Sequence, residues 1–66
     1  MTETQQFADA LRKSIRKDMN NYADDLATGR CRSFEEYREL CGVIKGLALA
    51  EAYLIETAKD FQNTDS

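Results

Sequence analysis

The chain contains no histidine, no proline and no tryptophan, and its 66 residues include only two cysteines and three glycines. Without histidine, the sequence lacks the commonest general base, and we find no second inward acid at a workable spacing. Two cysteines allow at most one internal bridge, which excludes the disulfide framework of a small secreted domain. Charges interrupt every apolar run before the ~18 to 20 residues that a membrane span needs. We therefore expect a non-enzymatic protein with no catalytic residues, no cofactor, no bound metal and no contact with a membrane.

Of the residues present, 42% are hydrophobic and 32% are charged, and the net charge is −3. This composition is typical of one small globular domain. A chain of this size buries only about 60% of its unfolded surface, and a single core rarely supplies more than ~3 to 5 kcal/mol. Because disulfides and metals are not available, we expect the chain to gain stability by oligomerisation. The polar and acidic first six residues predict no signal peptide, which favours an intracellular location.

Two segments have the periodicity of amphipathic helices. The first, about residues 4–28, can be capped by Thr2 or Thr4 and ends at Gly29, a residue suited to a left-handed conformation. Its apolar side chains recur at steps of three and four residues: Phe7, Leu11, Ile15, Met19, Tyr22 and Leu26.

The second helix, about residues 34–62, begins at a capping-box pattern formed by Ser33 and Glu36. Its apolar stripe is formed by Tyr37, Leu40, Ile44, Leu47, Leu54, Ala58 and Phe61. A turn of residues 29–33 is short enough to fold the helices back on each other. The sequence therefore predicts a single all-α domain over residues 1–66, an antiparallel two-helix hairpin that pairs into a four-helix bundle or a higher helical oligomer.

A ridge of small residues lies on the opposite side of the second helix. Gly42, Gly46 and Ala50 are spaced four residues apart, and each helical glycine costs roughly 0.5 to 1 kcal/mol relative to alanine. Together with Leu49 and Tyr53 they predict an interaction face for a second copy, as a homodimer or higher oligomer, or for a different protein. The alternative is that Leu49 and Tyr53 are ordinary partly exposed side chains and that the glycines are merely tolerated.

Glu51 continues the stripe of the second helix and should point into the hairpin. A buried carboxylate needs a partner or a raised pKa, and Arg12 is the nearest plausible cation across the hairpin. The pair is either a structural contact that fixes the register of the helices or a functional carboxylate.

A cluster of four cations lies on the first helix: Arg12, Lys13, Arg16 and Lys17. Doubled in a dimer, this basic patch is a candidate site for phosphates or nucleic acid. Nearby acids and the absence of interleaved aromatics equally favour a solvated face with pairing between turns of one helix.

The two cysteines predict no metal site, since nine residues separate them and histidine is absent. Cys41, at the edge of the stripe, is most simply a small buried side chain. Cys31 lies between Arg30 and Arg32, whose positive charge should lower the pKa of its thiol. Cys31 is therefore either a reactive thiol or an exposed inert one.

One segment of the chain resembles a known group of proteins. Its pattern consists of residues 32–37 followed by Leu40, Gly42, Ile44, Gly46, Leu47, Ala50 and Glu51. This pattern is similar to that of short helical-hairpin proteins of tailed bacteriophages, encoded among virion-assembly genes, and the resemblance covers residues 24–55. It implies a structural or assembly role beside a capsid, portal or neck protein, in the virion or the host cytoplasm. The alternative is a small phage regulator that binds a host protein or nucleic acid through the basic patch.

Overall fold

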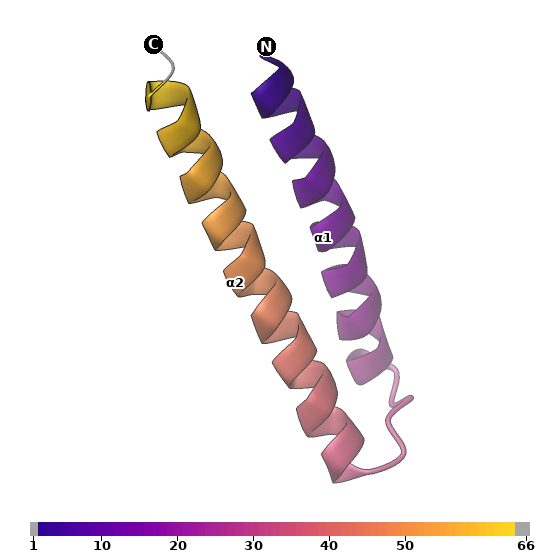
Figure 1. The fold of residues 1–66 in the computed structure, drawn as a ribbon. Helices are drawn as coiled ribbons and strands as arrows, with labels where there is room; N and C mark the ends of the chain where they lie inside the picture. The colour runs from indigo at the N-terminus through magenta and orange to yellow at the C-terminus, as the bar shows by residue number, and fades with distance from the viewer. Residues whose placement is uncertain (1, 65–66) are drawn as a thin grey trace.

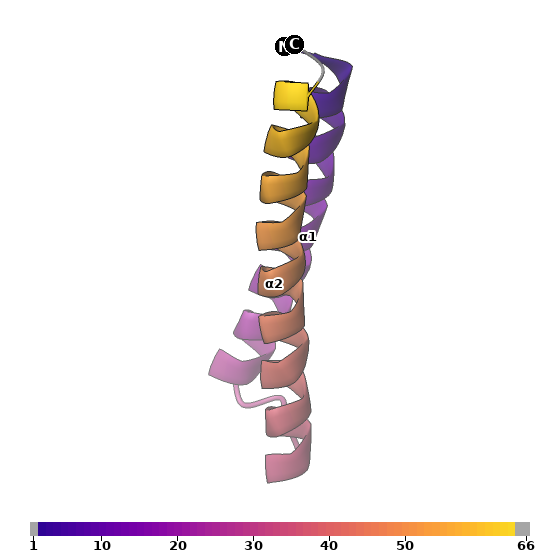
Figure 2. The ribbon, with the colours of Figure 1, turned by 60° about the vertical axis from the view of Figure 1, so that its left-hand side comes forward.

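The computed structural model describes residues 2–64, and in them two long helices lie side by side and antiparallel (Figure 1). Helix α1 spans Glu3–Ala27 and helix α2 spans Phe34–Thr64. The described residues contain no strand, and the molecule measures 50 × 16 × 10 Å. Figure 2 shows that the helices cross at a shallow angle. The predicted all-α hairpin is confirmed, and both helices begin and end within two residues of the predicted positions.

Local hydrogen bonds explain where α1 begins and ends. The Thr2 hydroxyl accepts a hydrogen bond from the Gln5 amide at 3.1 Å, which satisfies one of the free amides of the first turn. At the other end, Gly29 has a φ of +71°, the left-handed conformation that glycine adopts without strain. The helix therefore stops where the sequence predicts.

The start of α2 differs slightly from a standard capping box. The Ser33 hydroxyl accepts from the Glu36 amide at 3.2 Å, as expected. The Glu36 carboxylate, however, reaches one residue further back and accepts from the amide of Arg32 at 2.5 Å. It therefore holds the last part of the turn as well as the helix end.

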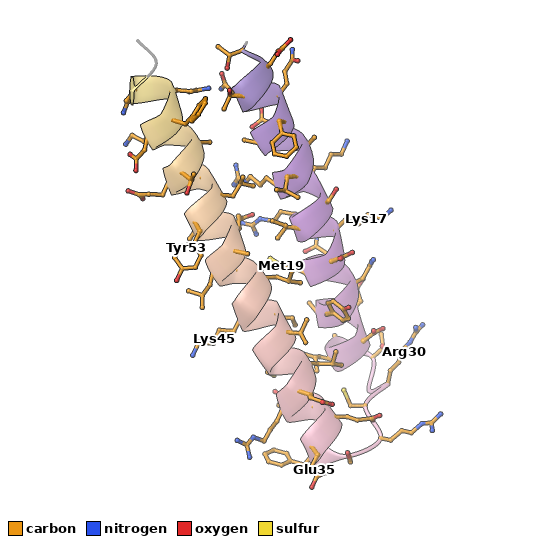
Figure 3. All side chains as sticks on the ribbon, in the orientation of Figure 1. Lys17, Met19, Arg30, Glu35, Lys45 and Tyr53 are labelled. Carbon is orange, nitrogen blue, oxygen red and sulfur yellow. The ribbon has the colours of Figure 1, made fainter. Side chains whose placement is uncertain are left out.

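Contact between the helices follows the predicted stripes. On α2 the side chains that α1 covers recur at three- and four-residue steps: Leu40, Ile44, Leu47, Glu51, Leu54 and Ala58. On α1 the half-buried apolar residues are Ala8, Ile15, Met19, Tyr22 and Leu26. Figure 3 shows Met19 between the two helices.

Several members of the predicted stripes are exposed in the hairpin. Among them, Phe7 is 69% exposed, Phe61 56% and Tyr37 47%. The apolar sector of each helix is wider than the strip that one neighbouring helix can cover, so residues at its margin stay in solvent. Including these residues in the hairpin contact was therefore wrong.

The hairpin has no buried apolar core among residues 2–63. The one buried residue in that range is Glu51, which is 8% exposed. Further large apolar side chains remain exposed on both helices: Leu11, Phe34, Val43, Leu49, Tyr53 and Ile55. Neither α1 nor α2 has a stretch long and apolar enough to cross a bilayer.

Candidate functional site

The centre of the hairpin is occupied by an ion pair that joins the two helices. Arg16 on α1 donates two hydrogen bonds to the Glu51 carboxylate on α2, from Nε to Oε2 at 2.5 Å and from Nη2 to Oε1 at 2.8 Å. Arg12, one turn earlier, donates from Nε to Oε2 at 3.4 Å. Both carboxylate oxygens are therefore satisfied, and the two-pronged Arg16 contact fixes the orientation of the carboxylate.

The structure thus places Glu51 against Arg12, the cation indicated by the sequence, and adds Arg16 as the closer partner. Sequence reasoning assigned Arg16 only to the basic patch. The signal that could have found it is its spacing, because residues four apart on a helix lie on one face.

These contacts keep Glu51 ionised. Hydrogen bonds from Arg16, the positive charge of Arg16 and the weaker contacts of Arg12 together outweigh burial, so the pKa of Glu51 lies below its ordinary value of 4.5. A general acid or base that works near neutral pH needs a pKa close to that pH. The site favours the structural reading of Glu51 over the functional carboxylate.

The predicted basic patch is divided by this ion pair. Arg12 and Arg16 turn toward Glu51, although about half of each side chain remains exposed. Lys13 and Lys17 are exposed, and Figure 3 shows Lys17 directed away from α2. The four cations therefore do not form one continuous free surface, because two of them share a carboxylate.

The predicted interaction face lies in solvent. Gly42, Gly46 and Ala50 are exposed, Leu49 is 48% exposed and Tyr53 is 67% exposed. Tyr53 points away from α1 (Figure 3). A Cβ added at Gly42 or Gly46 would meet nothing within 4 Å. The hairpin itself therefore gives no packing reason for either glycine, and the face is open to a partner.

Hollows lie along the seam between the helices, among them an apolar one at the open end of the hairpin and another beside the turn. The hollow at the open end is about 420 Å³ and mostly apolar, and Phe7, Leu54 and Phe61 contribute to its lining. The hollow beside the turn is about 410 Å³ and contains Tyr22 and Val43 together with acidic side chains. The sequence pattern marked neither hollow, because each is formed jointly by two helices.

Cys31 lines the hollow beside the turn and does not have the environment predicted for it. Its thiol pKa is raised, first by desolvation and then by the negative charges of Glu36 and Asp25. Arg30 lies 3.5 Å from Asp25, so part of its charge is already compensated. The expectation of a lowered pKa was wrong, since desolvation of the thiol, and after it the negative charges of Glu36 and Asp25, raise the pKa of Cys31.

Cys41 is half-buried rather than fully buried, and neither cysteine forms a disulfide. The described residues contain no group of three or more acidic or cysteine side chains that could hold a metal ion.

Comparison of the chain with protein-family models, with curated proteins and with solved structures finds no match.

Proposed function

We propose that the chain is a non-enzymatic assembly protein that acts by helix–helix association, first with a second copy of itself. The observation that carries this proposal is the burial pattern: among residues 2–63 the hairpin buries one carboxylate and no apolar side chain. Folded chains depend mainly on buried apolar surface for stability. A hairpin that leaves many of its large apolar residues exposed is therefore suited to gain stability from a protein partner.

The particle in which this association occurs is proposed from the sequence resemblance alone. The pattern over residues 24–55 is similar to that of tailed-bacteriophage hairpin proteins encoded among virion-assembly genes. We accordingly place the chain beside a capsid, portal or neck protein, in the virion or the host cytoplasm. Its long, narrow shape suits an element that spans or clamps neighbouring subunits.

The other candidate, a phage regulator that binds a host protein or nucleic acid through the basic patch, has weaker support. Arg12 and Arg16 are bound to Glu51, which leaves Lys13 and Lys17 as the cations of that patch outside this ion pair. Binding through phosphate contacts would weaken steeply with salt.

The test of the proposal is the mass of the purified full chain in solution, measured by light scattering between about 5 and 500 µM. We expect a dimer or larger oligomer whose mass does not change between 0.05 and 0.5 M salt, because apolar contacts are not screened. A monomer at every concentration would contradict self-association. A monomer that binds nucleic acid at low salt and releases it at high salt would support the regulator instead.

A further inference from the structure

One side of the hairpin carries a second regular stripe, distinct from the stripe that contacts α1. On α2, at alternating steps of four and three residues, it consists of Val43, Leu47, Ala50, Leu54, Thr57 and Phe61. This is the spacing of a helix that packs along a partner helix. None of the six is charged. We call this surface, together with Phe7 and Leu11 of α1, the apolar flank.

The apolar flank shares only Leu47 and Leu54 with the contact inside the hairpin. Val43 is 41% exposed and Phe61 56%, although both follow the stripe. On α1, Phe7 is 69% exposed and Leu11 41%. The flank is therefore an apolar surface, one helix stripe wide, that α1 covers only along the edge formed by Leu47 and Leu54.

The two hollows mark the two ends of this surface on one side of the molecule. Phe61 lines the hollow at the open end, and Val43, eighteen residues earlier, lines the hollow beside the turn. Phe7 and Asp25 of α1 line the same two hollows and are also eighteen residues apart. Eighteen residues make five helical turns, so corresponding positions face the same way. Both hollows therefore open on the side that carries the apolar flank.

The hairpin exposes more surface than a compact monomer of its mass, and the surplus is large enough for a dimer interface. The hairpin exposes 5448 Å², whereas a compact monomer of 7.5 kDa is expected to expose only about 4,200 Å². The surplus is about 1,200 Å² per chain, or about 2,400 Å² for a pair, which falls in the range of permanent dimers.

Charge decides how two copies can lie on each other. The hollow beside the turn is lined by Asp25, Glu36 and Glu39, with Arg30 as its one basic side chain. In the hollow at the open end, Glu3 is the one charged lining residue. Two copies with their turns at the same end would bring the acidic groups together, and such like-charge contacts are unfavourable. With the turns at opposite ends, these acids are far apart.

We propose that a second copy of this chain covers the apolar flank in the antiparallel direction, with α2 packed on α2 and the turns at opposite ends. The uncharged stripe runs from residue 43 to residue 61, so its midpoint, residue 52, lies at the twofold axis. Val43 of each copy then lies opposite Phe61 of the other, and Ala50 lies opposite Leu54, which pairs small side chains with large ones. Glu39 lies beyond the end of the opposing α2, in solvent.

This inference rests on the proposed self-association and adds the surface and the direction. The proposed dimer contact lies on the apolar flank, whereas the sequence predicted it on the outer face of α2, which carries Leu49 and Tyr53. Ala50 belongs to both surfaces.

The first experiment compares two substitutions at aliphatic residues of similar exposure on α2. Val43, 41% exposed, lies on the flank, and Leu49, 48% exposed, lies on the outer face. We expect Val43→Glu to raise the dimer dissociation constant by about 100-fold, because a charge would be buried in the interface. Leu49→Glu should change it less than about 3-fold. Sedimentation equilibrium measures both constants, and circular dichroism checks that helix content is kept.

The second experiment measures direction without altering the flank. A single nitroxide is placed at Glu35→Cys, at the turn end (Figure 3), in a chain that also carries Cys31→Ser and Cys41→Ala. At 1.5 Å per residue, the antiparallel arrangement puts the two labels about 50 Å apart, whereas turns at the same end put them within about 25 Å. Pulsed electron spin resonance on the dimer distinguishes these distances.

The outcomes separate this inference from the proposed function. Loss of the dimer in Val43→Glu alone, with a label distance of about 50 Å, supports the apolar flank. A dimer that survives Val43→Glu but is lost in Leu49→Glu, or a distance within about 25 Å, overturns the inference and leaves self-association intact. A wild-type chain that stays monomeric overturns both.

Discussion

Glu51 carries a negative charge into the contact between α1 and α2, where Arg16 and Arg12 compensate it. A buried ion pair is weak evidence for stability, because the charges must leave water. The pair restricts the alignment of the helices, because Glu51 has to lie level with Arg12 and Arg16. These arginines are one turn apart, so a slide of one turn would still leave one of them within reach, whereas a larger slide would leave the carboxylate among apolar side chains. The pair therefore favours a register within about one helical turn.

The lowered pKa of Glu51 predicts how stability depends on pH. A carboxylate with a lower pKa in the folded chain stabilises the fold fully above its unfolded value, near pH 4.5, and this contribution is lost as the pH falls through the folded pKa. We expect Glu51→Gln to melt at a lower temperature than wild type at pH 7. The two melting temperatures should converge once the pH has fallen below the folded pKa of Glu51.

Thermal unfolding followed by circular dichroism between pH 7 and pH 2 measures this difference. Glu56→Gln, which removes an exposed carboxylate from the same helix, is the matched control and should not converge with wild type in this way. A difference between Glu51→Gln and wild type that stays constant across this range would contradict the assigned role of the charge.

Glycine has a different role in each of the two helical elements. Gly29 ends α1 at a φ of +71°, which a side chain tolerates poorly, whereas Gly42 lies inside α2 with open space where a Cβ would be. The same substitution should therefore have opposite effects at the two positions. One glycine is required by the backbone, and the other lowers the stability of its helix.

We expect Gly29→Ala to reduce the free energy of unfolding by about 1 kcal/mol and Gly42→Ala to increase it by roughly 0.5 to 1 kcal/mol. Urea unfolding at a fixed protein concentration measures both changes. Gly46→Ala serves as a third variant, since its Cβ also meets nothing in the hairpin. If Gly46→Ala destabilises the assembly whereas Gly42→Ala stabilises it, the backbone of a partner helix lies close to residue 46.

The helices themselves could be predicted from the sequence because their signals are local. Steps of three and four residues identify the inward face of each helix, on which Ile15 and Ile44 lie. Gly29 identifies the end of α1, and the Ser33 cap identifies the start of α2. The alignment of the two helices along their axes is not determined by local signals. One turn is 5.4 Å, and an arginine side chain is about that long, so arginines on neighbouring turns can reach the same carboxylate. For this reason periodicity indicated Arg12 for Glu51 but did not place Arg16 closer. The raised pKa of Cys31 likewise depends on acids that approach only after the turn has folded.

At the scale of the whole molecule, the chain is a pair of amphipathic helices with more apolar surface than one contact can bury. In a dimer, folding and association are one equilibrium, so stability depends on protein concentration. We expect the melting temperature to rise by about 5 °C for each tenfold increase in concentration, given the entropy of unfolding of two such chains.

Calorimetry at 10, 100 and 1,000 µM would measure this dependence. Val43→Glu should melt at a lower temperature than wild type at each concentration, because its dimer is about 100-fold weaker. A wild-type melting temperature that is the same at all three concentrations would show that the hairpin is stable as a monomer despite its exposed apolar residues.

At the open end of the hairpin, the Gln62 side chain donates a hydrogen bond to the Thr2 hydroxyl at 3.0 Å. Both ends of the described chain lie at this end of the molecule (Figure 1). A pulling force applied at these two ends would load the contacts between the helices one after another, starting at the open end. The Thr2 contact would break first, and the Glu51 ion pair, halfway along, would be the point at which the opening pauses. A pull applied across the two opposite ends of the hairpin would instead load all of these contacts together and meet greater resistance.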